Sequence, residues 1–228
     1  MRDDHRSTVT IFAAAVNFGS RNHHDRAESE SMAKLYFRFG AMNCGKSTAL
    51  IQVDHNYRER GMNTILVKPG SDLKGDDEIV SRLDLSRRVD ILAGPDDNLF
   101  DLIHNYNTEN GPLHCALVDE AQFLSRAQAD QLFEVAVLLD IPVICYGLRT
   151  DFLMEGFPGS ERLLLLAHSL EELKTICTCG RKAMANARKV DGTFVFEGEQ
   201  LAIDGQNNVT YQSLCAQCYF KYKGKDTN

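Results

Sequence analysis

A glycine-rich turn followed by a lysine and a hydroxyl residue is the first feature of this sequence that indicates chemistry. Residues 38–51, RFGAMNCGKSTALI, contain the pattern G-x-x-x-x-G-K-S. Glycines at this spacing let backbone N–H groups surround phosphate oxygens, the lysine brings positive charge to the β- and γ-phosphates, and the serine hydroxyl is a ligand for Mg²⁺. The alternative is a chance glycine-rich turn, which the strand-like segment before it and the helix-compatible segment after it disfavour. We therefore expect ATP and Mg²⁺ to bind at Gly40, Ala41, Met42, Asn43, Cys44, Gly45, Lys46, Ser47 and Thr48.

Two adjacent carboxylates follow a second apolar run. In CALVDEAQF, residues 115–123, the apolar residues lead directly into Asp119 and Glu120. A carboxylate at the end of a buried strand beside the phosphate loop is a second protein contact for Mg²⁺. Asp119 fits that role together with Ser47, which leaves Glu120 free to act on a nucleophile. An exposed acid pair at a strand end is the alternative.

Four of the seven cysteines form two close pairs. Cys177-x-Cys179 and Cys215-x-x-Cys218 offer four thiolates, the ligand set of a structural Zn²⁺ site, and Gly180 would relieve the turn after the first pair. An iron–sulfur site, a redox pair and unrelated buried cysteines remain open. Because four protein ligands leave no open position, such a zinc would stabilise the fold and would not be catalytic.

Composition favours a small ligand in a reducing compartment. The chain has 228 residues, 32 acidic against 25 basic, and a net charge of −7, whereas nucleic-acid binders usually carry a basic patch. No apolar run approaches the roughly 20 residues that cross a bilayer. The other cysteines, Cys44, Cys115 and Cys145, stand singly in apolar runs and are predicted to be reduced core residues. We expect neither a membrane nor a nucleic acid as partner.

Strand-like and helix-like segments alternate along most of the chain. Strands are predicted at 34–40, 64–68, 88–92, 114–120 and 142–147, with helices at 46–60, 97–107 and 125–139. This alternation predicts an α/β fold with a largely parallel sheet and helices on both faces. Residues 1–31 are predicted to be a disordered extension and residues 32–169 a P-loop nucleotide-binding domain. Residues 170–228 are predicted to form a small β-rich lobe stapled by zinc.

The segments GAMNCGKST, DEAQF and YGLRTDF and the paired cysteines stand in one order. Together they resemble the zinc-containing, cytosolic type of thymidine kinase, called type II, from Met32 to about Tyr222. The resemblance implies ATP-dependent phosphorylation of thymidine to dTMP in nucleotide salvage. It also implies a lasso-type lid loop, a cytoplasmic homotetramer and feedback inhibition by dTTP.

The resemblance also implies roles for particular residues. Glu120 is similar to the base that accepts the 5′-hydroxyl proton, and Arg82 to an arginine that neutralises phosphate charge. Residues similar to the nucleoside pocket are the aromatic walls Phe123, Phe152 and Phe157, then Met42 near the thymine 5-position, Leu148 beneath the base, and Tyr211. Without the resemblance, each phenylalanine would be read as ordinary core.

Two departures from the family pattern concern the lid. Asp204-Gly205 stands where members commonly carry two glycines, with a longer spacer to Tyr211, and the first cysteine pair has one intervening residue where two are commoner. Deoxyuridine is a further expected substrate, since one methyl group is worth only about 1–3 kcal/mol of discrimination.

Two other functions are compatible with parts of this sequence. A P-loop ATPase or switch protein could bind nucleic acid through its zinc lobe, where basic residues gather, namely Lys174, Arg181, Lys182, Arg188 and Lys189. The net acidity and small size argue against it, and a purely structural zinc module would leave the phosphate loop unexplained.

Overall fold

The computed structural model describes residues 32–70, 78–80, 86–198, 200 and 208–224. The described residues belong to one compact unit that begins at Met32. The predicted extension 1–31, Arg82 and the Asp204-Gly205 pair lie outside the described residues.

A six-stranded sheet forms the centre of the fold, in the order β5-β2-β6-β7-β1-β8. Its strands are β1 (Leu35–Gly40), β2 (Asn63–Pro69), β5 (Ile91–Ala93), β6 (Leu113–Val118), β7 (Val143–Leu148) and β8 (Ser169–Leu173). Every neighbouring pair is parallel, so the predicted parallel sheet is confirmed. Because the strands are parallel, the residues that follow β1, β6 and β7 meet at one edge of the sheet.

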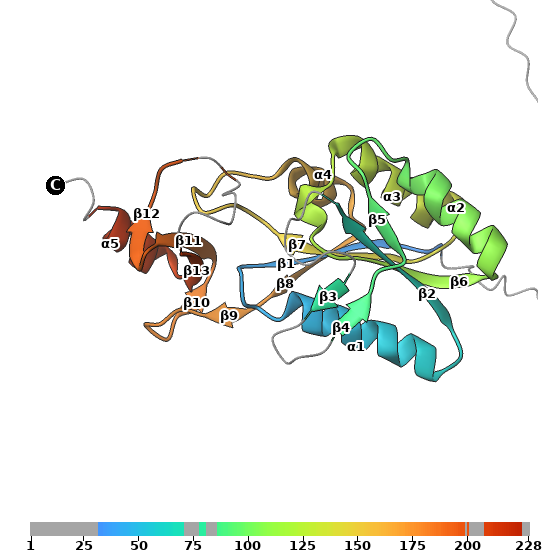
Figure 1. Cartoon of the computed structure of the whole chain (residues 1–228), viewed down its shortest axis with the longest axis horizontal. Coiled ribbons are helices and arrows are strands. Elements are labelled where there is room, and N and C mark those ends of the chain that lie inside the picture. The colour runs from blue at the N-terminus through green and yellow to red at the C-terminus, as the bar shows by residue number, and fades with distance from the viewer. Residues whose placement is uncertain (1–31, 71–77, 81–85, 199, 201–207, 225–228) are drawn as a thin grey trace, which may run out of the picture. The chain divides into compact units, whose positions relative to one another are not determined.

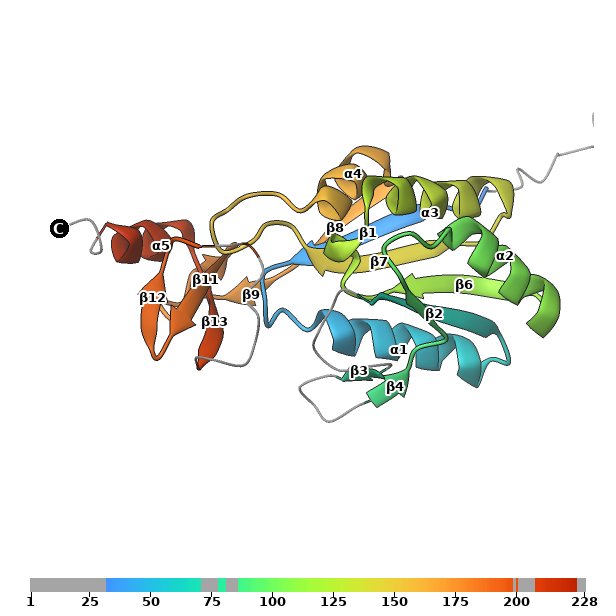
Figure 2. The same cartoon turned by 45° about the horizontal axis from the view of Figure 1, so that its top comes forward.

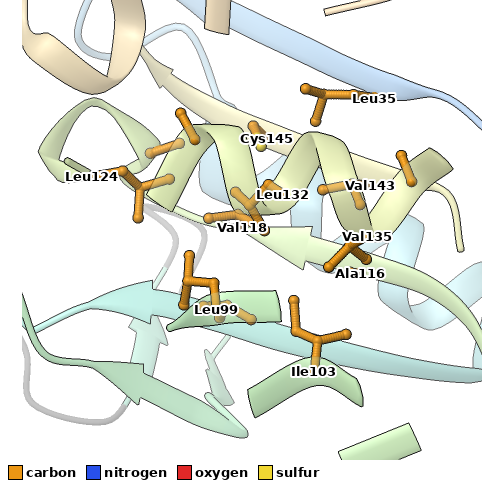
Figure 3. Close-up of a cluster of buried hydrophobic side chains, with 14 of the residues drawn as sticks. Leu35, Leu99, Ile103, Ala116, Val118, Leu124, Leu132, Val135, Val143 and Cys145 are labelled. Carbon is orange, nitrogen blue, oxygen red and sulfur yellow. The ribbon is translucent and has the colours of Figure 1, made fainter. Parts of the chain in front are cut away.

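Helices cover both faces of the sheet, as the alternation predicted (Figures 1 and 2). On one face α1 (Lys46–Glu59) packs Leu50 against Leu66, Leu117 and Tyr146. On the other face lie α2 (Leu99–Asn110), α3 (Arg126–Leu138) and α4 (Pro158–Leu166). Figure 3 shows this second core, in which Leu132 and Ile103 lie among side chains of the strands. These strand side chains point to the opposite face of the sheet from those that pack against α1. A period of two along each strand produces this division.

Three elements of the main fold differ from the prediction. Residues 88–92, predicted as one strand, are divided between two: β4 (Ser86–Arg88) pairs antiparallel with β3 (Glu78–Val80), and β5 joins the large sheet. No helix was predicted over the residues of α4, and no strand over those of β8. The chain leaves the large sheet only after Leu173, and the predicted division at residue 170 stays a prediction.

The described residues after Leu173 fold into small sheets and one helix. A three-stranded sheet has the order β12-β11-β13, from Thr193–Val195, Ala185–Val190 and Val209–Leu214, and β9 (Thr175–Ile176) pairs with β10 (Lys182–Ala183). Helix α5 (Ala216–Lys223) follows, and Tyr219 packs with Ala185, Leu214 and two of the cysteines. Among the described residues, no helix is both long and apolar enough to cross a membrane.

Candidate active site

The phosphate loop connects the end of β1 to the start of α1. Asn43 (φ 64°) and Gly45 (φ 83°) both adopt the left-handed region, which folds the loop back on itself. Gly45 is the N-cap of α1 and brings no side chain to the first amides of the helix, so these N–H groups and the helix dipole face the loop. The Lys46 ammonium is buried and lies 3.3 Å from the carbonyl oxygen of Ala41.

Gly40 is required by close packing at the end of β1. A Cβ atom there would lie 2.5 Å from the Leu173 carbonyl oxygen and 2.6 Å from the Cys44 sulfur. Cys44 is therefore a half-buried residue of the phosphate loop, and its predicted place in the core is wrong. Cys115 and Cys145 are fully buried, as predicted, and burial raises the pKa of the Cys115 thiol to about 12.

Ser47 and Asp119 meet at the edge of the sheet. The Ser47 hydroxyl lies 3.5 Å from Asp119 Oδ2, while the buried Asp119 Oδ1 has no hydrogen-bond partner among the described residues. Burial, and then the neighbouring Glu120 carboxylate, raise the pKa of Asp119 to about 7. A buried carboxylate oxygen with nothing to pair with is stabilised by a cation. This pair therefore fits Mg²⁺.

Glu120 follows Asp119 with its backbone in the left-handed region, at φ 47°. Such a conformation costs a non-glycine residue about 1 kcal/mol and is common at functional sites. Its carboxylate accepts a hydrogen bond from the side-chain amide of Gln122, whose carbonyl oxygen accepts the Leu148 N–H at 3.0 Å. Gln122 is almost fully buried. One amide thus connects the predicted base to the end of β7.

Helix α4 fixes the other side of the same junction. Ser160 donates a hydrogen bond to the Leu148 carbonyl oxygen, so both backbone polar groups of Leu148 are bonded to side chains. Gly159 permits this approach, because a Cβ atom there would lie 2.5 Å from the Ala121 carbonyl oxygen. The short 3₁₀ turn η1 (Ala121–Phe123) is thereby held between β7 and α4.

The predicted nucleoside residues lie in two groups. Phe123 and Phe157 pack edge to face, with ring centroids 5.7 Å apart. Phe152 and Tyr211 both contact Arg188: its guanidinium lies 3.7 Å from the Phe152 ring centroid, and its Nε donates to the Tyr211 hydroxyl at 3.2 Å. Arg188, one of the five basic residues on which the nucleic-acid alternative drew, is buried and so is not exposed to a polymer.

The loop between β7 and α4 has its own internal framework. The side chain of the buried Asp151 accepts the N–H groups of Leu153 and Glu155 at 2.8 and 2.9 Å. Thr150 and Gly156 close the loop through a bridge, and the Tyr219 hydroxyl donates to the Phe152 carbonyl oxygen at 2.9 Å. This loop is therefore tied to α5.

Met42 was predicted to lie in both the phosphate loop and the nucleoside pocket, and its backbone is bonded to side chains of the three-stranded sheet β12-β11-β13. Its N–H donates to Asn186 Oδ1 at 2.7 Å, and its carbonyl oxygen accepts from the Ser213 hydroxyl. Asn186 also donates to the Thr150 carbonyl oxygen at 2.9 Å. None of Asn186, Ser213 and Gln122 was predicted to be a site residue. The only sequence signal is a polar residue at a position that a strand or turn buries.

The four paired cysteines converge, as their spacing predicted. Their sulfur atoms all lie within 4.8 Å of one another, and those of Cys179 and Cys215 are 3.6 Å apart. A tetrahedral zinc site with Zn–S bonds of about 2.3 Å needs sulfur separations of about 3.8 Å. Gly180 takes the left-handed turn (φ 83°) that the predicted turn around the metal needs.

Hydrogen bonds within the cluster shift the pKa values of three of these thiols in different directions. Burial raises the pKa of Cys177, but hydrogen bonds from the backbone N–H groups of Cys179 and Cys215 outweigh it and lower the value to about 6. The backbone N–H of Cys218 lowers the pKa of Cys215. Hydrogen bonds with the side chains of Cys179 and Cys215 raise the pKa of Cys218 to about 12. A bound divalent cation would stabilise the thiolate form of all four cysteines.

A cavity of about 620 Å³ lies beside η1 and the start of α3. Its walls include Pro69, Gly94, Phe123, Phe157 and Gln200. Its size suits a small organic ligand, but of the predicted pocket residues it includes only Phe123 and Phe157. No substrate is assigned to it.

A family model described as thymidine kinase matches residues 33–219. A thymidine kinase from Rhodopirellula baltica is 50% identical over 192 residues, covering 83% of this chain and 89% of that protein. A thymidine kinase from Haemophilus influenzae is 50% identical over 190 residues, covering 82% and 96%. Among solved structures, the Legionella pneumophila ATPase DotB aligns with a TM-score of 0.38 and 18% identity, over 66% of this chain and 44% of that one. So low a score supports no conclusion.

Proposed function

The chain belongs to the thymidine kinase family, and from this premise we propose that it transfers the γ-phosphoryl group of ATP to the 5′-hydroxyl of thymidine. As a family member it is a thymidine kinase and acts in nucleotide salvage. The products of the proposed transfer are dTMP and ADP. The observation that carries the proposal is the adjacency of Asp119 and Glu120 opposite the phosphate loop, with Ser47 3.5 Å from Asp119.

Phosphate charge is compensated by three kinds of group in this proposal. Backbone N–H groups of residues 40–48 surround the β- and γ-phosphates, the buried Lys46 adds a full positive charge, and Arg82 neutralises the group in transfer. Ser47 and Asp119 would hold Mg²⁺, and the orphaned Asp119 Oδ1 supports this. When bound, the ion neutralises charge that develops on the transferred phosphoryl oxygens.

Glu120 accepts the proton of the thymidine 5′-hydroxyl. Because phosphoryl transfer has a loose transition state, alignment of the hydroxyl contributes more than its deprotonation. The hydrogen bond from Gln122 to the Glu120 carboxylate supports this role, since it fixes the acceptor oxygen in one orientation.

Thymine is bound between aromatic faces and backbone groups. Phe123, Phe152 and Phe157 wall the ring, Met42 lies near its 5-position, and Leu148 lies beneath it. Tyr211 adds a polar contact. The two side-chain hydrogen bonds that fix the Leu148 backbone support a preformed floor, which lowers the entropic cost of binding.

The four cysteines would hold a structural Zn²⁺ that stabilises the C-terminal lobe. The sulfur separations and the four-thiol donor set fit the ion. Zinc serves catalysis indirectly here, because Tyr211 of β13 and the loop that Tyr219 anchors both depend on the lobe. Deoxyuridine as a second substrate, feedback inhibition by dTTP, a homotetrameric assembly and a cytoplasmic location complete the proposal.

The test is a nucleoside panel. Purified protein is incubated with MgATP and, separately, thymidine, deoxyuridine, deoxycytidine and deoxyadenosine, and monophosphate formation is measured. We expect phosphorylation of thymidine and, more slowly, deoxyuridine. Nucleoside-independent ATP hydrolysis that nucleic acid stimulates would instead favour the ATPase alternative.

A further inference from the structure

Two side chains of the small sheet hold one residue of the phosphate loop by both of its backbone polar groups. Asn186 on β11 and Ser213 on β13 face each other as register partners. Asn186 Oδ1 accepts the Met42 N–H at 2.7 Å, and the Ser213 hydroxyl donates to the Met42 carbonyl oxygen. Both side chains are buried, with exposed fractions of 3% and 8%. We call Asn186 and Ser213 the Met42 clamp.

The clamp connects three parts of the molecule. Asn186 donates from its other amide atom to the Thr150 carbonyl oxygen, in the loop after β7. Ser213 stands two residues before Cys215, and Leu214 between them is fully buried with Cys177 and Cys215. The Thr175 hydroxyl adds a contact to the Asn43 carbonyl oxygen at 3.4 Å. Figure 2 shows the turn between β1 and α1 reaching towards the strands of the lobe.

We propose that Asn186 and Ser213 are positioning residues that act through Met42 to hold the phosphate loop in its nucleotide-binding form. This inference rests on the proposed function, because it takes residues 40–48 as the ATP site. An unrestrained glycine-rich loop samples many conformations, and ATP must then select the competent one. The apparent affinity for ATP is then the affinity of the competent form multiplied by the fraction of molecules in that form. The clamp keeps this fraction high, and makes it depend on the folded cysteine lobe.

The size of the effect follows from the groups that would be left unpaired. Removal of the Ser213 hydroxyl leaves the Met42 carbonyl oxygen without its partner, and the loop then escapes to solvated forms. The penalty for such an unpaired group corresponds to a loss of about 5- to 30-fold in apparent ATP affinity. Because Asn186 and Ser213 act on the same residue, the loss in the double variant should be smaller than the product of the single losses.

The experiment measures binding of a non-hydrolysable ATP analogue with Mg²⁺ to the full-length chain, with zinc content measured on the same samples. The variants are Ser213→Ala, Asn186→Leu and their combination. Ser213→Thr keeps the hydroxyl and should restore affinity. Thr210→Ala is the matched control, since it removes an exposed hydroxyl from the same strand. We expect weaker binding in Ser213→Ala at full zinc content, with a raised KM for ATP and a smaller change in kcat.

The proposal is overturned if Ser213→Ala and Asn186→Leu bind the analogue as tightly as the unsubstituted protein, or no worse than Thr210→Ala. It is also overturned if affinity falls only in samples that have lost zinc. If these variants fail to fold, the rate of hydrogen exchange of the Met42 amide, measured in the unsubstituted protein, tests the proposal instead. Slow exchange without nucleotide supports the clamp, and exchange as fast as in an open loop refutes it. Binding of the analogue needs no thymidine, so a failed nucleoside panel would overturn the proposed function without deciding this question.

Discussion

Replacement of Gln122 by methionine should separate orientation of the base from stability of the fold. Methionine has nearly the length and volume of glutamine, so packing at this buried position is kept while both hydrogen bonds are lost. Those bonds join the Gln122 amide to the Glu120 carboxylate and to the Leu148 N–H. The change therefore frees the carboxylate and loosens the end of β7.

The magnitude follows from the two bonds. The buried Leu148 N–H, left unpaired, costs about 1–3 kcal/mol. The half-buried Glu120 carboxylate can recover part of its lost bond from water. We expect a loss of about 2–3 kcal/mol in the free energy of unfolding, or roughly 5–10 °C in Tm. Misplacement of a catalytic group by about 1 Å costs up to 10²-fold in rate, so kcat should fall by about 10²-fold.

Steady-state kinetics with thymidine and thermal unfolding are the assays. Gln128→Met is the matched control, because Gln128 is also buried and its side-chain amide also makes two hydrogen bonds, from the Ser125 N–H and to the Gly94 carbonyl oxygen. It should lose similar stability and keep its kcat. Glu120→Gln combined with Gln122→Met should be no slower than Glu120→Gln alone. A kcat within threefold of the unsubstituted protein for Gln122→Met would refute the positioning argument.

Three further predictions concern the metal sites and the core. Asp119→Asn should raise the Mg²⁺ concentration needed for half-maximal activity by at least about tenfold, measured by Mg²⁺ titration, and an unchanged titration curve would remove Asp119 from the metal site. The Cys177→Ala variant, or the protein treated with a chelator, should lack one zinc per chain and should not phosphorylate thymidine. Zinc content is measured with a chromogenic assay on the samples used for kinetics, and full activity without metal would show that the C-terminal lobe folds without zinc. Asp54→Asn should lower the free energy of unfolding at pH 7 by about 2 kcal/mol, because it breaks the ion pairs of the buried Asp54 with Arg58 and Arg87. The pair with Arg58 contributes less to this loss, because Arg58 is half-exposed. Burial raises the pKa of Asp54, but hydrogen bonds from Thr64 and Arg58 outweigh it and hold the pKa below its usual 3.8; the stability difference between the two proteins in denaturant titrations should therefore persist above about pH 4 and shrink as pH falls below it.

Local patterns were sufficient for the parts of the fold that depend on neighbouring residues. The phosphate loop, its strand and its helix are adjacent in sequence, so spacing alone places Gly40, Lys46 and Ser47 in one turn. The convergence of the four cysteines was likewise predictable, because four thiols with metal-ligand spacing have few other arrangements in a reduced protein. Parallel pairing then brought Asp119 beside Ser47.

Contacts between distant segments were not predictable in this way. Asn186 and Met42 are separated by 144 residues, and no periodicity in either segment reports the other. Helix α4 was missed because Pro158 and Gly159 read as loop residues, although proline at the first turn of a helix is favourable and the glycine serves close packing on η1. Short strands such as β3 and β4 carry too few residues to show a period.

The central claim is that Glu120 serves as the base for phosphoryl transfer to thymidine, and one comparison tests it most directly. Thymidine-dependent ADP release is measured for the unsubstituted protein and for Glu120→Gln, with MgATP affinity measured on both. The account predicts ADP release that requires thymidine, a loss of at least about 10²-fold in the variant, and equal ATP affinity. Thymidine-dependent release that survives in the variant would contradict it.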